Sequence, residues 1–78
     1  KELLSGCYYV QIAALSDTAR ISELLEKYAT TYPMTLVPLA SGKGYQVMVG
    51  PLTADEYGSI QAKFKAFGFK DAFIRKIR

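Results

Sequence analysis

Hydrophobic and polar residues alternate along two short segments of the chain, and each of these segments leads into a stretch with helical periodicity. Tyr8 to Ser16 and Tyr45 to Thr53 share one pattern: a Tyr, β-branched residues at alternate positions, and a Leu followed by a hydroxyl residue. A period of two predicts a strand with one buried face, and the hydroxyl residue suits the N-cap of a helix. The repeat therefore predicts two strand-to-helix halves of one βαββαβ domain.

The residues after the first alternating segment predict an amphipathic helix. Ser16 or Asp17 is the candidate N-cap, because a side-chain oxygen there can accept hydrogen bonds from the free N–H groups of the first turn. We expect the helix to end at Tyr32-Pro33, since proline disfavours the α conformation in the residue before it. Apolar residues at helical spacing predict the stripe that faces the sheet, namely Ile21, Leu24, Leu25 and Tyr28.

The residues after the second alternating segment predict another helix. Gly50-Pro51 is expected to stop the strand, and Thr53 and Glu56 have the spacing of a capping box. Gly58 lies inside this helix, and Gly68 is expected to supply its C-terminal cap. The predicted core-facing stripe consists of Tyr57, Ile60, Phe64 and Phe67.

Two shorter strands complete the predicted sheet. Residues 34–39 form one of them, and Pro38 places it at the edge because proline cannot donate to the hydrogen-bond ladder. The glycine-rich residues 40–44 predict a hairpin turn, and residues 72–77 predict the last strand. With right-handed crossovers, this order gives an α+β ferredoxin-like sandwich, in which the first and third strands are central and both helices cover one face of an antiparallel sheet.

The same alternation predicts which side chains lie on the opposite, helix-free face. Glutamine amides there donate and accept hydrogen bonds, and aromatic rings offer flat apolar contact. This combination suits sugars, whose hydroxyl groups hydrogen bond and whose C–H faces stack on rings, and it also suits nucleobases. The residues predicted on the helix-free face are Tyr9, Gln11, Ala13, Gly44, Gln46, Met48, Phe73 and Arg75.

Composition narrows the chemistry further. The 78 residues are expected to form an N-terminal extension, residues 1–6, and a single domain, residues 7–78. A net charge of +3 favours polyanions without choosing among them. With no His and one Cys, the chain lacks the usual transition-metal ligands and cannot form a disulfide within itself. We therefore expect no catalytic site and no cofactor, and no stretch approaches the ~20 apolar residues of a membrane span.

Three segments, in this order and spacing, resemble the SPOR (sporulation-related repeat) domain: Tyr8 to Leu15, Tyr45 to Leu52, and Ala66 to Ile74. The resemblance implies a domain of a larger membrane-anchored or secreted protein, located in the periplasm or elsewhere in the bacterial cell envelope. We expect the domain to be monomeric. The resemblance also implies binding to peptidoglycan, in particular to glycan strands stripped of stem peptides at the division septum. Gln11 matches a glutamine of the family's site, and the full set of expected glycan-binding residues is Gln11, Tyr9, Gln46, Met48, Phe73 and Arg75.

The chain departs from the family pattern at three positions. A serine often found three positions after the site glutamine is Ala14 here, and an aromatic common at the start of the third strand falls on Gly44. An arginine frequent two residues later is replaced by Gln46. Tyr9 and Tyr45 are the candidates to supply the missing ring.

Two other functions use the same topology. Lys43-Gly44-Tyr45 matches the start of the third-strand signature of RNA-recognition motifs, but Val47 stands where a base-stacking aromatic is expected. Val47 therefore discriminates between the two, because the repeat predicts that it is buried in the core. A protein-interaction domain could instead use the edge of residues 34–39, although Pro38 makes that edge a poor template for strand addition. We expect no nucleic-acid partner.

Overall fold

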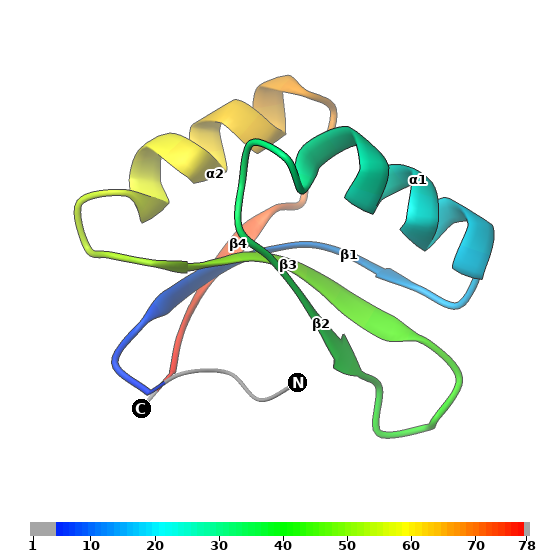
Figure 1. Cartoon of the computed structure of the whole chain (residues 1–78). Helices are drawn as coiled ribbons and strands as arrows, with labels where there is room; N and C mark the ends of the chain where they lie inside the picture. The colour runs from blue at the N-terminus through cyan, green and yellow to red at the C-terminus, as the bar shows by residue number, and fades with distance from the viewer. Residues whose placement is uncertain (1–4, 78) are drawn as a thin grey trace.

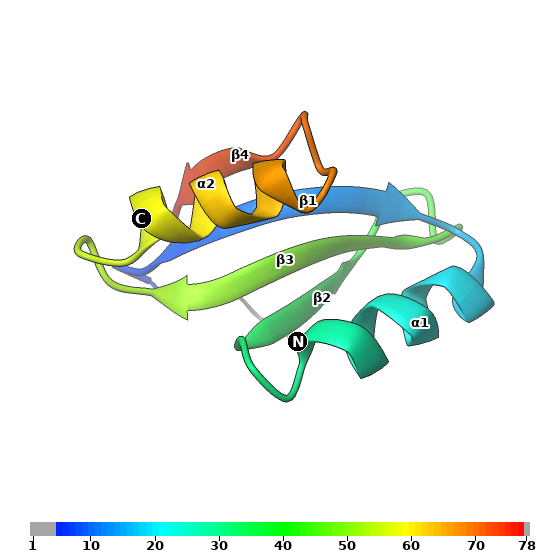
Figure 2. The same cartoon turned by 90° about the horizontal axis from the view of Figure 1, so that it is seen from above.

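The computed structural model describes residues 5–77, so residues 1–4 of the expected extension and Arg78 lie outside the described part. Four strands form one antiparallel sheet in the order β2-β3-β1-β4, with β1 and β3 at its centre. Both helices lie on one face of this sheet (Figure 1), α2 on the β1 and β4 side and α1 on the β2 and β3 side (Figure 2). The predicted ferredoxin-like α+β fold is confirmed. The elements are β1 (Tyr8–Leu15), α1 (Thr18–Tyr28), β2 (Met34–Pro38), β3 (Tyr45–Leu52), α2 (Tyr57–Ala66) and β4 (Phe73–Lys76).

Helix α1 begins as predicted but ends early. The Asp17 carboxylate accepts hydrogen bonds from the N–H groups of Ala19 at 2.9 Å and Arg20 at 3.4 Å, which makes Asp17 the N-cap. The expectation that α1 extends to Tyr32-Pro33 is wrong, because the chain turns at Tyr28, whose carbonyl accepts from the N–H groups of residues 31 and 32. The two threonines of this turn, residues 30 and 31, are β-branched and favour leaving the helix.

Strand β3 runs further than predicted, and α2 starts later. Gly50-Pro51 does not stop the strand, because a register irregularity lets Leu52 still pair with Tyr8 of β1. The Thr53 N–H donates to the Glu56 carboxylate at 2.9 Å, so this half of the capping box is formed, but it closes a turn that precedes the helix. At the other end, Gly68 has a φ of +115° and ends α2 in a Schellman motif, as predicted.

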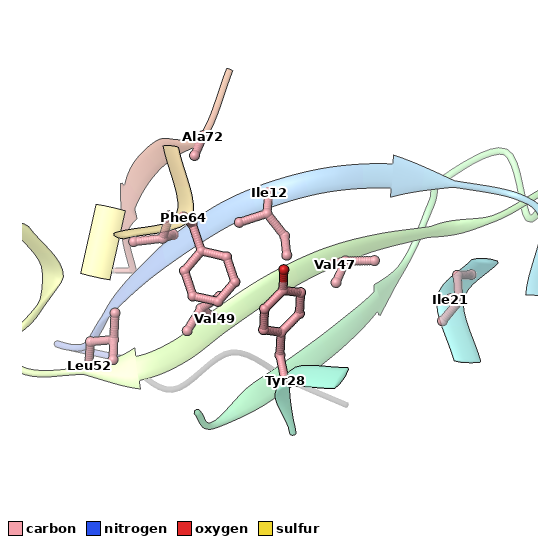
Figure 3. Packing of buried hydrophobic residues seen from close by; sticks show 9 residues of the cluster. Ile12, Ile21, Tyr28, Val47, Val49, Leu52, Phe64 and Ala72 are labelled. Carbon is pink, nitrogen blue, oxygen red and sulfur yellow. The ribbon is translucent and has the colours of Figure 1, made fainter. Parts of the chain in front are cut away.

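The hydrophobic core lies between the helices and the sheet. Phe64 of α2 is fully buried, and its ring centroid lies 5.0 Å from that of Tyr28 and 5.1 Å from that of Tyr32. Figure 3 shows the Phe64 and Tyr28 rings side by side within the cluster that contains Val47 and Val49. The core therefore connects the two helices through aromatic contacts and fixes both against the central strands.

Candidate functional site

A β-bulge determines which residues of β1 lie on the helix-free face. The pairing of β1 with β3 shifts between Gln11 and Ala13, so that Ala13 aligns with Val47 and Ala14 with Gln46. Ala13 consequently packs against the core. The prediction that Ala13 lies on the helix-free face is wrong, because the bulge adds one residue to β1 and breaks the alternation. Ala14 takes that place, on the same face as Gln46.

Arg75 joins the two glutamines predicted for the site. Its Nη1 atom donates to Gln46 Oε1 at 3.1 Å and to Gln11 Oε1 at 3.4 Å, and all three side chains are part-buried. Each residue comes from a different strand, β4 for Arg75, β3 for Gln46 and β1 for Gln11. Because the amide oxygens face the guanidinium, the NH₂ groups of both glutamines remain as donors toward a ligand. We call these three residues the Arg75 cluster.

The apolar residues of the predicted site fall into two groups. Tyr9 and Met48 are only 1% and 0% exposed, so they form the interior of the helix-free side and do not present a surface. Phe73, in contrast, is 48% exposed and aligns with Gln11 across the β1–β4 pair. Phe73 is therefore the accessible ring beside the Arg75 cluster.

A small hollow lies next to Gln11. Its volume is about 260 Å³, and it is lined by Gln11, Ala14, Asp71 and Phe73 together with residues 12 and 13 of β1. The sheet bows so that this side of the molecule is concave (Figure 1). Asp71 was not among the predicted site residues, and its one signal in the sequence is its position two residues before Phe73. The amide of Gln11, the carboxylate of Asp71 and the ring of Phe73 therefore line the same hollow.

The aromatic residue that the family commonly has at the start of β3 cannot be accommodated at position 44 of this chain. Gly44 has a φ of +155°, and a Cβ on it would lie 2.5 Å from the Leu15 carbonyl oxygen. Tyr45 does not replace it either, because its side chain lies on the helix side, beside Leu25 of α1. The restriction at Gly44 results from its close approach to Leu15, whereas the side of Tyr45 follows from the alternation along β3 that it shares with Val47 and Val49.

The described residues hold few groups suited to other chemistry. Among residues 5–77, no group of three or more His, Cys, Asp or Glu residues could hold a metal ion. In the same part of the chain, no helix has the length and apolar character needed to cross a bilayer.

Together, the fold and the face define a small ferredoxin-like domain of the ligand-binding class, with hydrogen-bonding groups and a ring on the side opposite its helices. The family model described as SPOR domain matches residues 4–76, so the chain belongs to the SPOR domain family. SPOR domains are peptidoglycan-binding modules, without catalytic activity, that occur in envelope proteins and act in cell division. No curated protein and no solved structure matches the chain.

Proposed function

We propose that this domain binds peptidoglycan glycan strands that lack stem peptides, with the strand lying on the helix-free face. The observation that carries the proposal is the Arg75 cluster beside the exposed ring of Phe73. The cluster presents N–H donors from two amides and a guanidinium, which match the hydroxyl and N-acetyl oxygens of the glycan. Phe73 offers a flat apolar surface for the C–H face of a sugar ring.

Within this proposal, the predicted site residues have two roles. Gln11, Gln46, Arg75 and Phe73 contact the glycan directly. Tyr9 and Met48, which are buried, form the floor that supports these side chains from the interior. The domain acts as a monomer outside the cytoplasm and directs its parent protein to the division septum.

RNA binding is the less favoured function. Base stacking on a sheet of this topology requires exposed aromatic rings on the central strands. Val47 is fully buried in the core, as the repeat predicted, Tyr9 is 1% exposed, and Tyr45 lies on the helix side. Strands β1 and β3 therefore offer no stacking platform within the described residues.

Sedimentation with purified sacculi tests the proposal. The domain should sediment with sacculi treated with an amidase and much less with untreated sacculi. Gln11→Ala and Gln46→Ala should each reduce the bound fraction, whereas Ser22→Ala at an exposed position of α1 should not. Equal binding by the glutamine variants would contradict the proposed face, and submicromolar binding to RNA with a steep salt dependence would favour the alternative.

A further inference from the structure

Arg75 carries a positive charge that its hydrogen-bond partners among residues 5–77 do not balance. Both partners, the side-chain oxygens of Gln11 and Gln46, are neutral, and both accept from the same nitrogen, Nη1. Nη1 has two hydrogens, so the two bonds use it fully. Among residues 5–77, the structure records no hydrogen bond from Nε or Nη2 of this side chain. Nε and Nη2 together form one edge of the guanidinium. In proteins, this edge can donate two parallel hydrogen bonds to one carboxylate.

The two glutamines hold this edge in place. A free arginine side chain loses rotamer entropy when it binds a ligand, whereas a tethered one has already lost part of it. Because one tether comes from β1 and the other from β3, the guanidinium is fixed over the centre of the sheet. The arrangement is that of a preorganised anion-binding group.

The proposed ligand gains carboxylates when its stem peptides are removed. In an intact strand, the lactyl group of each muramic acid ends in an amide bond to the peptide. Hydrolysis by an amidase adds water across that bond and releases the peptide as an amine, which leaves a lactyl carboxylate on the sugar. The strand changes from neutral to negatively charged at each such position.

We propose that Arg75 is the specificity-determining residue of the site and binds this lactyl carboxylate. The inference rests on the proposed function, and it gives the chemical basis by which stripped strands are distinguished from intact ones. Asp71 lies in the hollow beside Gln11 and Phe73, so a carboxylate is repelled there and is placed on the Arg75 side. An arginine at this site recognises the group that only the stripped strand presents.

The neighbouring residue offers a matched control. Lys76 has the same charge as Arg75, but its Nζ lies 5.6 Å from the centre of the Tyr8 ring, which stacks on Tyr57 of α2 on the helix side. Lys76→Gln therefore removes one positive charge from the protein without changing the helix-free face. Arg75→Gln removes the same charge from the site itself.

The experiment compares two forms of one polymer. Glycan strands from amidase-treated sacculi are used as prepared and after carbodiimide coupling to methylamine, which converts each lactyl carboxylate into a neutral N-methylamide. The unmutated domain and Lys76→Gln should bind the carboxylate form about tenfold more tightly, the scale of a charge-assisted hydrogen bond. Arg75→Gln should bind both forms with similar affinity.

The outcomes separate the two proposals. Equal binding of both forms by the unmutated domain, or an unchanged preference in Arg75→Gln, would overturn the role of Arg75 and leave glycan binding intact. No binding to either form would instead contradict the proposed function. Thermal unfolding by circular dichroism checks that the variants fold.

Arg75→Lys is the second variant of the site. It keeps the positive charge but lacks the paired donors, so it should reduce the preference for the carboxylate form. An undiminished preference in Arg75→Lys would also overturn the inference.

Discussion

The ring of Tyr9 lies directly on the backbone of Gly50. A Cβ added to Gly50 would be 2.6 Å from Tyr9 Cδ2 and 2.9 Å from the Tyr8 carbonyl oxygen, and the Gly50 φ is +149°. This contact joins β1 to β3 on the helix-free side of the sheet. The carbonyl of Gly50 also accepts a 2.9 Å hydrogen bond from the Thr35 hydroxyl, so the same residue fixes β2 as well.

Gly50→Ala should therefore destabilise the domain strongly. The backbone strain alone costs about 1–3 kcal/mol, and the clash with the Tyr9 ring adds to it. Gly42→Ala separates the two causes, because Gly42 has a φ of +75° but nothing within 4 Å of the added Cβ. Urea unfolding should show a larger loss for Gly50→Ala; equal losses would mean that the Tyr9 contact is unimportant.

Gly58→Ala should stabilise the domain. Gly58 lies within α2, is exposed, and has no neighbour within 4 Å of an added Cβ. The close packing that would offset its low helix propensity is therefore missing, and alanine should raise the free energy of unfolding by about 0.5–1 kcal/mol. Gly68→Ala is the opposite control, since its φ of +115° disfavours a side chain. A higher urea midpoint for both variants would contradict this account of α2.

Phe64→Ala should abolish cooperative folding. Phe64 is fully buried and contacts the rings of Tyr28, Tyr32, Phe67 and Phe69. Removing such a ring costs about 3–5 kcal/mol, which is comparable to the whole stability expected for a single core of this size. Phe67→Ala, at a position that is 48% exposed, should retain a thermal transition in near-UV circular dichroism. If Phe64→Ala unfolded cooperatively at a temperature near that of the unmutated domain, Phe64 would not be central to the core.

Two of the three departures from the family pattern, Ala14 and Gly44, should respond differently when the family's residue is restored. Ala14 is exposed on the helix-free face opposite Gln46, so Ala14→Ser should leave stability unchanged and increase glycan binding a few-fold by adding a hydroxyl group. Gly44→Phe should destabilise the domain, because the Cβ would lie 2.5 Å from the Leu15 carbonyl oxygen. Sacculus binding and thermal unfolding of both variants check this, and a stable Gly44→Phe would show that the hairpin can move.

The fold was predictable because its signals are local. Strict alternation from Tyr45 to Val49 placed Val47 on the buried side of β3 correctly. Asp17 and Gly68 cap the helices as the carboxylate of the one and the missing Cβ of the other predict. The bulge after Gln11 was not predictable, since nothing in residues 11–13 distinguishes a bulged strand from a regular one.

The site was predictable only as a set of residues on one face. That Arg75 bonds both glutamines depends on the register of three strands and on the reach of a long side chain, neither of which the alternation contains. Tyr9 and Met48 have the alternation of surface residues, yet they are buried. Their burial is a property of the tertiary structure and not of the sequence period.

The bulge in β1 also determines how the specificity of this domain can be re-engineered. A combinatorial library designed on alternation would randomise positions 11 and 13 and would place half of its diversity in the core. Because the register shift brings Gln11 and Ala14 to the same side, the pair to randomise is 11 and 14, together with positions 46 and 73. Selection from such a library would explore new polymer ligands without unfolding the scaffold.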